Sequence, residues 1–531
     1  MGIKSVRMVK IYDTTLREGA QGRNISFTLQ DKINITLKLD EFGVHYIEGG
    51  WPSSNPKDLE YFKRIRDYAL RNSVVTAFGS TKHKGNSIHS DPSLNAIIDA
   101  EVEVATLVCP ASKFHAEKVL KIDAQTHADM VYDSITYLKA HGIDVIFDAE
   151  HFYLGYKLDR EYALGILKVA REGRAMAIVL CDTNGGSLPQ EVYDATKCVT
   201  SNIRGEVGVH CHNDGGLAVA NTVFAVIAGA SQVQGTINGF GERCGNADLC
   251  QVIPTLELKL GIRTISRGDM YKLRHLTRLS RYVYELANIP ANPYQPYVGE
   301  YAFAHKAGIH VDALSKTVEA YEHVDPALVG NVRSITVSEL SGRTSIVMKA
   351  NELGIEVGED EPRISNALKE VKDLECKGYQ LENANATLTL ILLKHLGKFE
   401  KFFEVQSWKT VTEGKDQEVV AESSVKVKVN GETMYEIAEG LGPVHAQDLA
   451  LRKSLVKYYP EVKKVSLTNY KVSVIDTGFG TASTVRVYVE FSDGKGSWAT
   501  VGVSTNILEA SKNALIDGYL YFLHKAKGII R

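Results

Sequence analysis

The first indication of chemistry is a pair of histidines separated by one residue, His210-Cys-His212, at the end of the apolar run Val207–Val209. Successive side chains of a strand alternate between its faces, so the two imidazoles point the same way. Two adjacent imidazoles form half of a divalent metal site. They could instead be polar residues that face solvent, but the apolar start of the run is typical of a buried parallel strand. A metal site then requires that the fold bring a carboxylate to face them.

The chain up to residue 270 alternates short apolar runs with amphipathic stretches, a pattern that predicts a (β/α)8 barrel of the α/β fold class. The expected strands are Val9–Tyr12, Tyr46–Glu48, Val74–Phe78, Val104–Val108, Val145–Phe147, Ala177–Leu180, Val207–Val209 and Val233–Gly235. The clearest expected helices are Leu29–Phe42, Pro56–Arg71, Ala128–His141, Arg160–Arg171 and Leu188–Asn202. Polar residues follow several of these strands, and the carboxyl ends of barrel strands form the active face. Each polar stretch alone could be an ordinary loop, but together they predict one pocket.

Glu18, which follows the first strand, is the most suitable carboxylate to complete the metal site. Strands one and seven of the barrel are separated only by strand eight, so Glu18 can meet His210 and His212 at one ion. Asn246, after strand eight, can add a carbonyl oxygen as an outer or weak fourth ligand. This donor set leaves positions for water and substrate, and it suits Mg²⁺, Mn²⁺ or Zn²⁺ acting as a Lewis acid.

A 2-oxo acid suits such an ion, because its keto and carboxylate oxygens can chelate together. Arg17 could face a developing oxyanion or a substrate carboxylate, or could form a structural salt bridge. Thr183 could hydrogen-bond the substrate carboxylate, and Glu150 could be an acid, a base or a positioning group. His310, delivered from outside the barrel, could take the proton in the enolisation of a thioester methyl group. Glu150 and His310 could equally be buried polar residues with satisfied hydrogen bonds.

Two further parts follow the barrel. We expect 271–395 to form helical accessory subdomains that could cover the barrel mouth. We expect 396–531 to form a C-terminal α+β domain of duplicated β-β-α units that pack against each other. Its expected strands and helices are Phe402–Trp408, Ser424–Val429, Val444–Tyr459, Leu467–Val474, Thr484–Phe491 and Ile507–Lys525. Such a domain could bind a small effector, form a dimer, or be a structural appendage.

The composition is that of a globular enzyme with more than one core, at 531 residues with 44% hydrophobic and 24% charged side chains. A net charge of -3 gives no basic field, so we expect no nucleic acid and no membrane surface as partner. No apolar run reaches the roughly 18 residues of a membrane span, and the N-terminus does not resemble a signal peptide. The seven cysteines are scattered, which indicates a reduced, cytoplasmic location.

The chain resembles the isopropylmalate and homocitrate synthase family through three motifs: Asp13-Thr-Thr-Leu-Arg-Glu-Gly19, His210-Cys-His-Asn-Asp214 and Gly241-Glu-Arg-Cys-Gly-Asn-Ala247. That family consists of metal-dependent (β/α)8 barrels that condense acetyl-CoA with a 2-oxo acid, and 396–531 resembles its allosteric C-terminal domain. Glu18 departs from the isopropylmalate branch, which usually carries aspartate, and is similar to the homocitrate branch. The stretches Glu48–Pro56 and Asp148–Phe152 look most like the branch that uses pyruvate.

The resemblance implies a role for each matching residue around the ion. Glu18, His210 and His212 would be the metal ligands, and Asn246 would lie close to the ion. Arg17 would face the carbonyl group of the substrate.

The resemblance also implies which residues carry out the reaction. Thr183 would hold the substrate carboxylate, and Glu150 would be the catalytic glutamate. His310 and Tyr321 would be acid/base residues that reach in from the accessory region, often from the other subunit of a homodimer. The implied reaction joins acetyl-CoA to pyruvate and hydrolyses the thioester to release CoA.

By the same resemblance, the C-terminal domain would bind an amino-acid effector, expected to be isoleucine, as a feedback inhibitor. The nearest rival is a sister synthase that takes 2-oxoisovalerate or 2-oxoglutarate, because one or two methylenes change discrimination by only about 1–3 kcal/mol. A lyase or aldolase on the same barrel is a second rival, and the duplicated C-terminal unit argues against it. A non-catalytic amino-acid sensor with a dead barrel is a third, and the full set of polar residues argues against that.

Overall fold

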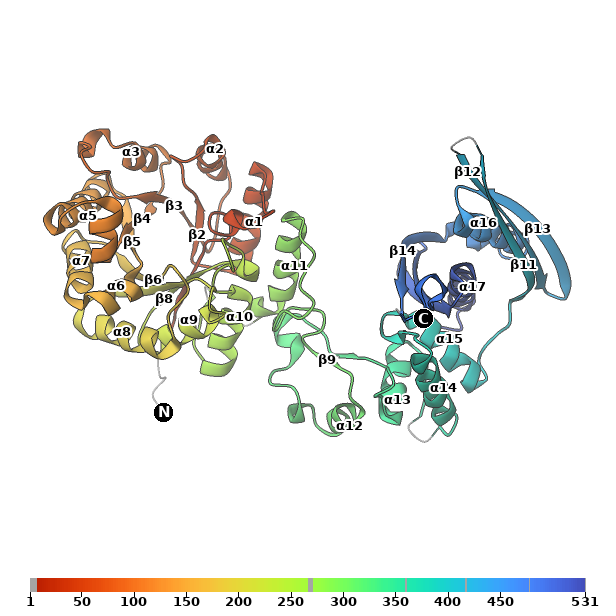
Figure 1. Cartoon of the computed structure of the whole chain (residues 1–531). Coiled ribbons are helices and arrows are strands. Elements are labelled where there is room, and N and C mark those ends of the chain that lie inside the picture. The colour runs from red at the N-terminus through yellow and green to blue at the C-terminus, as the bar shows by residue number, and fades with distance from the viewer. Residues whose placement is uncertain (1–6, 266–270, 359–360, 416–417, 477, 531) are drawn as a thin grey trace. The chain divides into compact units, whose positions relative to one another are not determined.

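The computed structural model describes residues 7–265, 271–358, 361–415, 418–476 and 478–530, which form two compact units. The first unit contains the chain up to Phe303 together with Val324–Val332. The second contains Ala304–His323 and the chain from Arg333 onward. In Figure 1 the barrel of the first unit runs from red to yellow-green, and most of the second unit is cyan to blue. The boundary expected at residue 270 lies outside the described residues.

Eight parallel strands close into a barrel in chain order, with β8 pairing with β1. They are β1 (Lys10–Asp13), β2 (Tyr46–Gly50), β3 (Val74–Ser80), β4 (Val104–Pro110), β5 (Asp144–Glu150), β6 (Ala177–Asp182), β7 (Glu206–Cys211) and β8 (Gln232–Gly235). Each of the eight expected strands overlaps one of these, so the predicted (β/α)8 barrel is confirmed.

Helices surround the barrel and cover the outer face of its strands (Figure 1). They are α1 (Leu29–Phe42), α2 (Pro56–Ile65), α3 (Pro92–Asp99), α4 (Lys113–His115), α5 (Ala124–Ala140), α6 (Phe152–Leu158), α7 (Arg160–Glu172), α8 (Pro189–Asn202), α9 (Ala218–Ile227), α10 (Leu249–Pro254) and α11 (Leu276–Leu286). Across the ranges given above, none of the helices has the length and apolar content that a membrane span requires.

The alternation of strand side chains separates two apolar cores. Ile11 and Val209 belong to the large core that includes the surrounding helices. Tyr12 and Val179 belong to a smaller buried cluster made chiefly of strand residues. Because Val209 faces the helices, the next side chain along β7, that of His210, faces the barrel interior.

Helix α1 shows how local sequence sets an element's limits. Its first turn is capped by Thr28, whose hydroxyl accepts from the backbone N–H of Asp31 while the Asp31 carboxylate accepts from the N–H of Thr28. The helix ends at Gly43, whose φ of 102° is readily adopted only by glycine.

One barrel helix is shorter than expected. The helix predicted over Pro56–Arg71 ends at Ile65. The buried carboxylate of Asp40 accepts hydrogen bonds from the backbone N–H groups of Asn72 and Ser73, at 2.7 and 2.8 Å. These bonds hold the chain in an irregular conformation before β3, and helical periodicity does not report such a tertiary contact.

The second unit begins with short elements and helices and continues with two antiparallel sheets. The first group is β9 (Ala304–His305), α12 (Gly308–Lys316), β10 (Ser334–Ile335), α13 (Arg343–Glu352), α14 (Ile364–Cys376) and α15 (Asn385–Leu396). The sheets and their helices are β11 (Phe403–Lys415), β12 (Glu418–Val429), β13 (Glu432–Gly440), α16 (Pro443–Val456), β14 (Ser466–Val474), β15 (Val485–Ser492), β16 (Ser497–Ser504) and α17 (Ile507–Ala526).

The C-terminal duplication is present, with three strands before each helix where two were expected. The additional strand β13 alternates exposed and half-buried side chains and is rich in glutamate, so its apolar signal is weak. The additional strand β16 contains Gly502, where a Cβ atom would lie 2.0 Å from the carbonyl oxygen of Ala510 on α17. Residues of both repeats, among them Leu451 and Leu515, share one buried core.

Candidate metal centre and pocket

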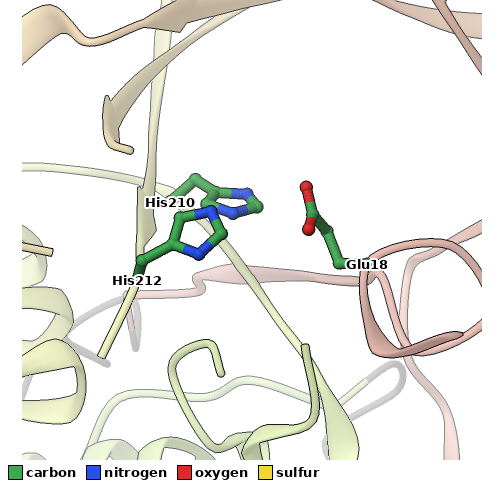
Figure 2. Close-up of side chains that lie close together, drawn as sticks. All are labelled: Glu18, His210 and His212. Atoms are coloured by element: carbon green, nitrogen blue, oxygen red, sulfur yellow. The ribbon is translucent and has the colours of Figure 1, made fainter. Parts of the chain in front are cut away.

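The carboxyl end of the barrel brings together the three residues that the sequence grouped as metal ligands. His210 lies in β7, His212 follows one residue after the strand, and Glu18 follows β1. Their potential ligand atoms all lie within 4.8 Å of one another, and all three residues are buried. Figure 2 shows the carboxylate of Glu18 facing the two imidazole rings.

Two buried polar atoms next to this cluster have no hydrogen-bond partner among the described residues: His212 Nδ1 and Asn246 Oδ1. The amide nitrogen of Asn246 donates to the carbonyl oxygen of Phe240 at 2.9 Å, which leaves its oxygen free. Buried polar atoms are normally paired, so these two atoms suit a ligand that the polypeptide does not supply. Two imidazoles, a carboxylate and an amide oxygen form a donor set that fits a divalent ion.

The electrostatics of the cluster favour the protonation states that a metal requires. Burial alone would raise the pKa of Glu18, but Arg17, His210 and His212 together lower it to about 2. Burial lowers the pKa of His212 to about 4, and the neighbouring His210 contributes to the shift. At pH 7 Glu18 is therefore ionised and His212 is neutral, as metal ligands must be.

Arg17 both forms ion pairs and lines the pocket. Its Nη1 donates to Glu18 Oε1 at 2.7 Å, and its Nε donates to Glu48. The guanidinium carbon lies 3.6 Å from the ring centroid of Phe78. Burial alone would lower the pKa of Arg17, but Glu18 and Glu48 raise it above its usual value. Arg17 thus stays charged in the interior. The sequence left open whether Arg17 binds substrate or forms a structural salt bridge; it forms salt bridges and also lines the pocket, so the two roles are compatible.

One pocket of about 250 Å³ at this end of the barrel contains most of the expected site residues. Trp51, Phe78 and Val108 supply apolar surface in its lining. The expected residues in the lining are Arg17, Glu18, Glu150, Thr183, His210 and His212.

Glu150 and Thr183 occupy the ends of neighbouring strands in this pocket. Glu150 ends β5, and burial together with the charge of Glu18 raises its pKa. The hydroxyl oxygen of Thr183 accepts a hydrogen bond from the backbone N–H of His151 at 2.8 Å, so its own hydrogen can be donated to another group. Arg243, which the sequence analysis did not select, also lines the pocket and donates to the Thr183 carbonyl oxygen at 2.8 Å.

His310 and Tyr321 belong to the second unit, where they contact each other. His310 lies on α12, and Tyr321 follows the short helical turn Val318–Ala320. Their rings stack with centroids 4.1 Å apart, and both side chains are exposed. The contact supports a shared role for the pair, which stays a prediction.

Two polar residues in the barrel interior, Glu48 and Gln234, received no individual role from the sequence analysis. Glu48 is fully buried and accepts hydrogen bonds from the Tyr12 hydroxyl, at 2.9 Å, and from Arg17. Gln234 is fully buried and contacts both His210 and Asp148. The available signal was a glutamate or glutamine on the inward-facing side of a barrel strand.

Comparison with known proteins identifies the family. Residues 8–283 match the HMGL-like family model, 297–378 the homocitrate synthase post-HMGL domain-like model, and 382–523 the LeuA allosteric (dimerisation) domain model. An (R)-citramalate synthase of Sulfolobus acidocaldarius is 51% identical over 98% of each chain. The chain belongs to the (R)-citramalate synthase family. An (R)-citramalate synthase of Geobacter sulfurreducens is 47% identical over 98% of this chain and 99% of its own. An (R)-citramalate synthase of Aquifex aeolicus is 45% identical over 97% of this chain and 98% of its own.

The His212→Ala variant of this member of the citramalate synthase family should lose metal binding and keep its fold. Removing a group that only supports a ligand typically weakens metal binding by about 10–100-fold, so loss of a ligand should weaken it by at least about 100-fold. Titration with Mn²⁺ followed by electron paramagnetic resonance measures the affinity, and circular dichroism monitors the fold. The exposed His141 serves as the control through His141→Ala. Wild-type affinity in His212→Ala would remove this residue from the ligand set.

Asp13 holds the turn that leads to Arg17 and Glu18. Its carboxylate accepts hydrogen bonds from the backbone N–H and the hydroxyl of Thr15, both at 2.9 Å. Burial raises the pKa of Asp13 to about 7, although these hydrogen bonds oppose the shift. In an unfolded chain the aspartate pKa is about 3.9, so between these values the folded barrel binds a proton that the unfolded chain releases.

The free energy of unfolding should therefore depend on pH through Asp13. Its contribution to stability falls as pH rises from about 4 to about 7, by up to about 1.4 kcal/mol per pH unit. Asp13→Asn removes this dependence, and any fixed cost of the amide is equal at every pH. Urea unfolding of both proteins across this range should show that the free energy of unfolding of the variant increases relative to that of the wild type as pH rises. A pH-independent difference would mean that Asp13 is ionised in the folded protein.

Proposed function

We propose that this chain condenses acetyl-CoA with pyruvate and hydrolyses the resulting thioester to give (R)-citramalate and CoA. The observation that carries the proposal is the cluster of Glu18, His210 and His212 beside Arg17, in a chain of the (R)-citramalate synthase family. We infer that the cluster binds Mn²⁺ or Mg²⁺, with Zn²⁺ as the alternative, and that Asn246 lies close to the ion.

The pocket residues would orient pyruvate for attack. A bound divalent ion would supply Lewis-acid polarisation of the keto group. Arg17 donates a hydrogen bond to the keto oxygen as negative charge develops there, which its buried and permanently charged guanidinium is suited to do. Thr183 donates its hydroxyl hydrogen to the pyruvate carboxylate, since its oxygen already accepts from His151. The keto carbon is then the atom exposed to the nucleophile.

The nucleophile arises when a base takes a proton from the methyl group of acetyl-CoA. Glu150, whose pKa is raised by burial and by the charge of Glu18, and the contacting pair His310 and Tyr321 are the groups that we assign to this proton transfer. The enolate carbon attacks the keto carbon of pyruvate, and the former keto oxygen takes up a proton. Water then attacks the thioester carbonyl and CoA leaves as the thiol.

Release of CoA from acetyl-CoA should depend on pyruvate and on a divalent ion. With Mn²⁺ present, turnover with pyruvate should exceed turnover with 2-oxoisovalerate or 2-oxoglutarate by at least about 10-fold, because the larger chains require additional room in the pocket. Thiol release measures the rate, EDTA should abolish it, and chiral chromatography should identify the R product. A preference for 2-oxoisovalerate would move the chain to the sister synthase. No release with any of the three acids would favour the amino-acid sensor.

We further propose a homodimer that is regulated through residues 396–531. The match of 382–523 to an allosteric (dimerisation) domain model supports both features. We also propose the division into 1–270, 271–395 and 396–531; three family models match consecutive parts of the chain, over 8–283, 297–378 and 382–523. All seven cysteines are free, which supports a reduced, cytoplasmic location.

Isoleucine added to the intact protein should lower the rate of CoA release and slow amide hydrogen exchange within 396–531. A ligand that binds the folded domain stabilises the segments that it contacts, and those segments then open less often. Hydrogen exchange read by mass spectrometry locates the protection, with glycine as the control amino acid. Protection confined to the barrel would place the effector site there instead.

A further inference from the structure

Gln234 lies fully buried between His210 of the metal cluster and Asp148 of strand β5. Its Oε1 lies 2.7 Å from His210 Nδ1, and its Nε2 donates to Asp148 Oδ1 at 2.9 Å. Gln234 on β8 is paired in register with His210 on β7, so the two side chains lie side by side on the inner face of the barrel. The other two residues of this chain of contacts are also buried, at 4% exposure for His210 and 3% for Asp148.

The direction of the Gln234 amide determines which nitrogen of His210 carries hydrogen. Because Nε2 of the glutamine donates to Oδ1 of Asp148, the amide oxygen faces the imidazole. That oxygen can only accept, so His210 Nδ1 must carry the hydrogen. The other ring nitrogen, Nε2, then has a free electron pair and can bind an ion. A reversed amide would donate to Nδ1, place the hydrogen on Nε2 and prevent that nitrogen from being a ligand.

The same strand provides a contrast two residues earlier. Gln232 is also fully buried in β8, but neither of its polar side-chain atoms has a hydrogen-bond partner among the described residues. Both side chains are glutamines in the barrel interior, so a substitution at either position changes the packing by a similar volume. Only Gln234 contacts a residue of the metal cluster, so its effect on metal binding can be separated from its effect on packing.

We propose that Gln234 is a positioning residue for the metal centre, which fixes the tautomer and the ring orientation of His210 while Asp148 fixes the direction of the Gln234 amide. The inference rests on the proposed function, because it takes His210 as a metal ligand. It adds a residue on β8 that does not touch the ion or the substrate and acts through His210. Groups that orient metal-binding histidines typically contribute about 10–100-fold to metal affinity.

Three variants of the full-length protein test the proposal through Mn²⁺ affinity, measured by electron paramagnetic resonance and without turnover. Gln234→Met preserves the side-chain volume and removes the acceptor, so it should weaken Mn²⁺ binding by about 10–100-fold. Gln234→Glu retains a side-chain oxygen that accepts from His210 Nδ1, and its second oxygen can share a proton with the Asp148 carboxyl group, so it should recover most of that loss. Gln232→Met alters the same interior in the same way and should bind Mn²⁺ as the wild type does.

The outcomes separate this inference from the proposed function. Wild-type affinity in a folded Gln234→Met variant would overturn the positioning role and leave the metal site intact. Equal losses in Gln234→Met and Gln232→Met would assign the effect to packing and also overturn it. If Gln234→Glu binds as weakly as Gln234→Met, the acceptor oxygen is not what matters, and the proposal fails. If the wild type itself binds no Mn²⁺, the metal site fails, and the inference fails with it.

Discussion

The buried negative charge of Glu18 is the constraint on which the rest of the site depends. A carboxylate removed from water costs several kcal/mol unless other groups compensate it. Here the compensation that the polypeptide itself supplies comes from the Arg17 guanidinium at 2.7 Å. Arg17 in turn contacts Glu48, so two carboxylates share one permanent cation in the barrel interior. A divalent cation at the imidazoles would complete this balance of charge, which makes the ion part of the electrostatics of the fold as well as of the chemistry.

The closed barrel makes this arrangement possible with few residues. Strands β1, β8 and β7 are consecutive neighbours around the barrel, so Glu18, Gln234 and His210 reach one region from adjacent positions. Alternation along β7 sends Val209 into the outer core and His210 into the interior. The same residues that close the hydrophobic core therefore fix the direction of the metal ligands, and a change of register would remove both at once.

The sequence predicted the parts of this site that follow from periodicity and neighbour relations. His210 and His212 share a face because strands alternate, and Glu18 was placed opposite them because β1 and β7 lie one strand apart. Nothing in the sequence assigned an individual role to Gln234 or Glu48. Glu48 ends the apolar part of its strand, and Gln234 alternates with Val233 as polar residues do in an ordinary half-buried strand. The early end of α2 was missed because it depends on a tertiary contact: the Asp40 carboxylate of α1 binds the backbone that follows α2.

The central claim is that one divalent ion binds between Glu18, His210 and His212. The most direct measurement is anomalous X-ray diffraction from crystals soaked with Mn²⁺ and pyruvate, recorded on both sides of the manganese absorption edge. The account predicts a single strong anomalous peak within coordination distance of the Glu18 carboxylate and both imidazoles, with the oxygens of pyruvate completing the coordination. A peak elsewhere in the barrel, or an ion that does not contact these three side chains, would contradict it.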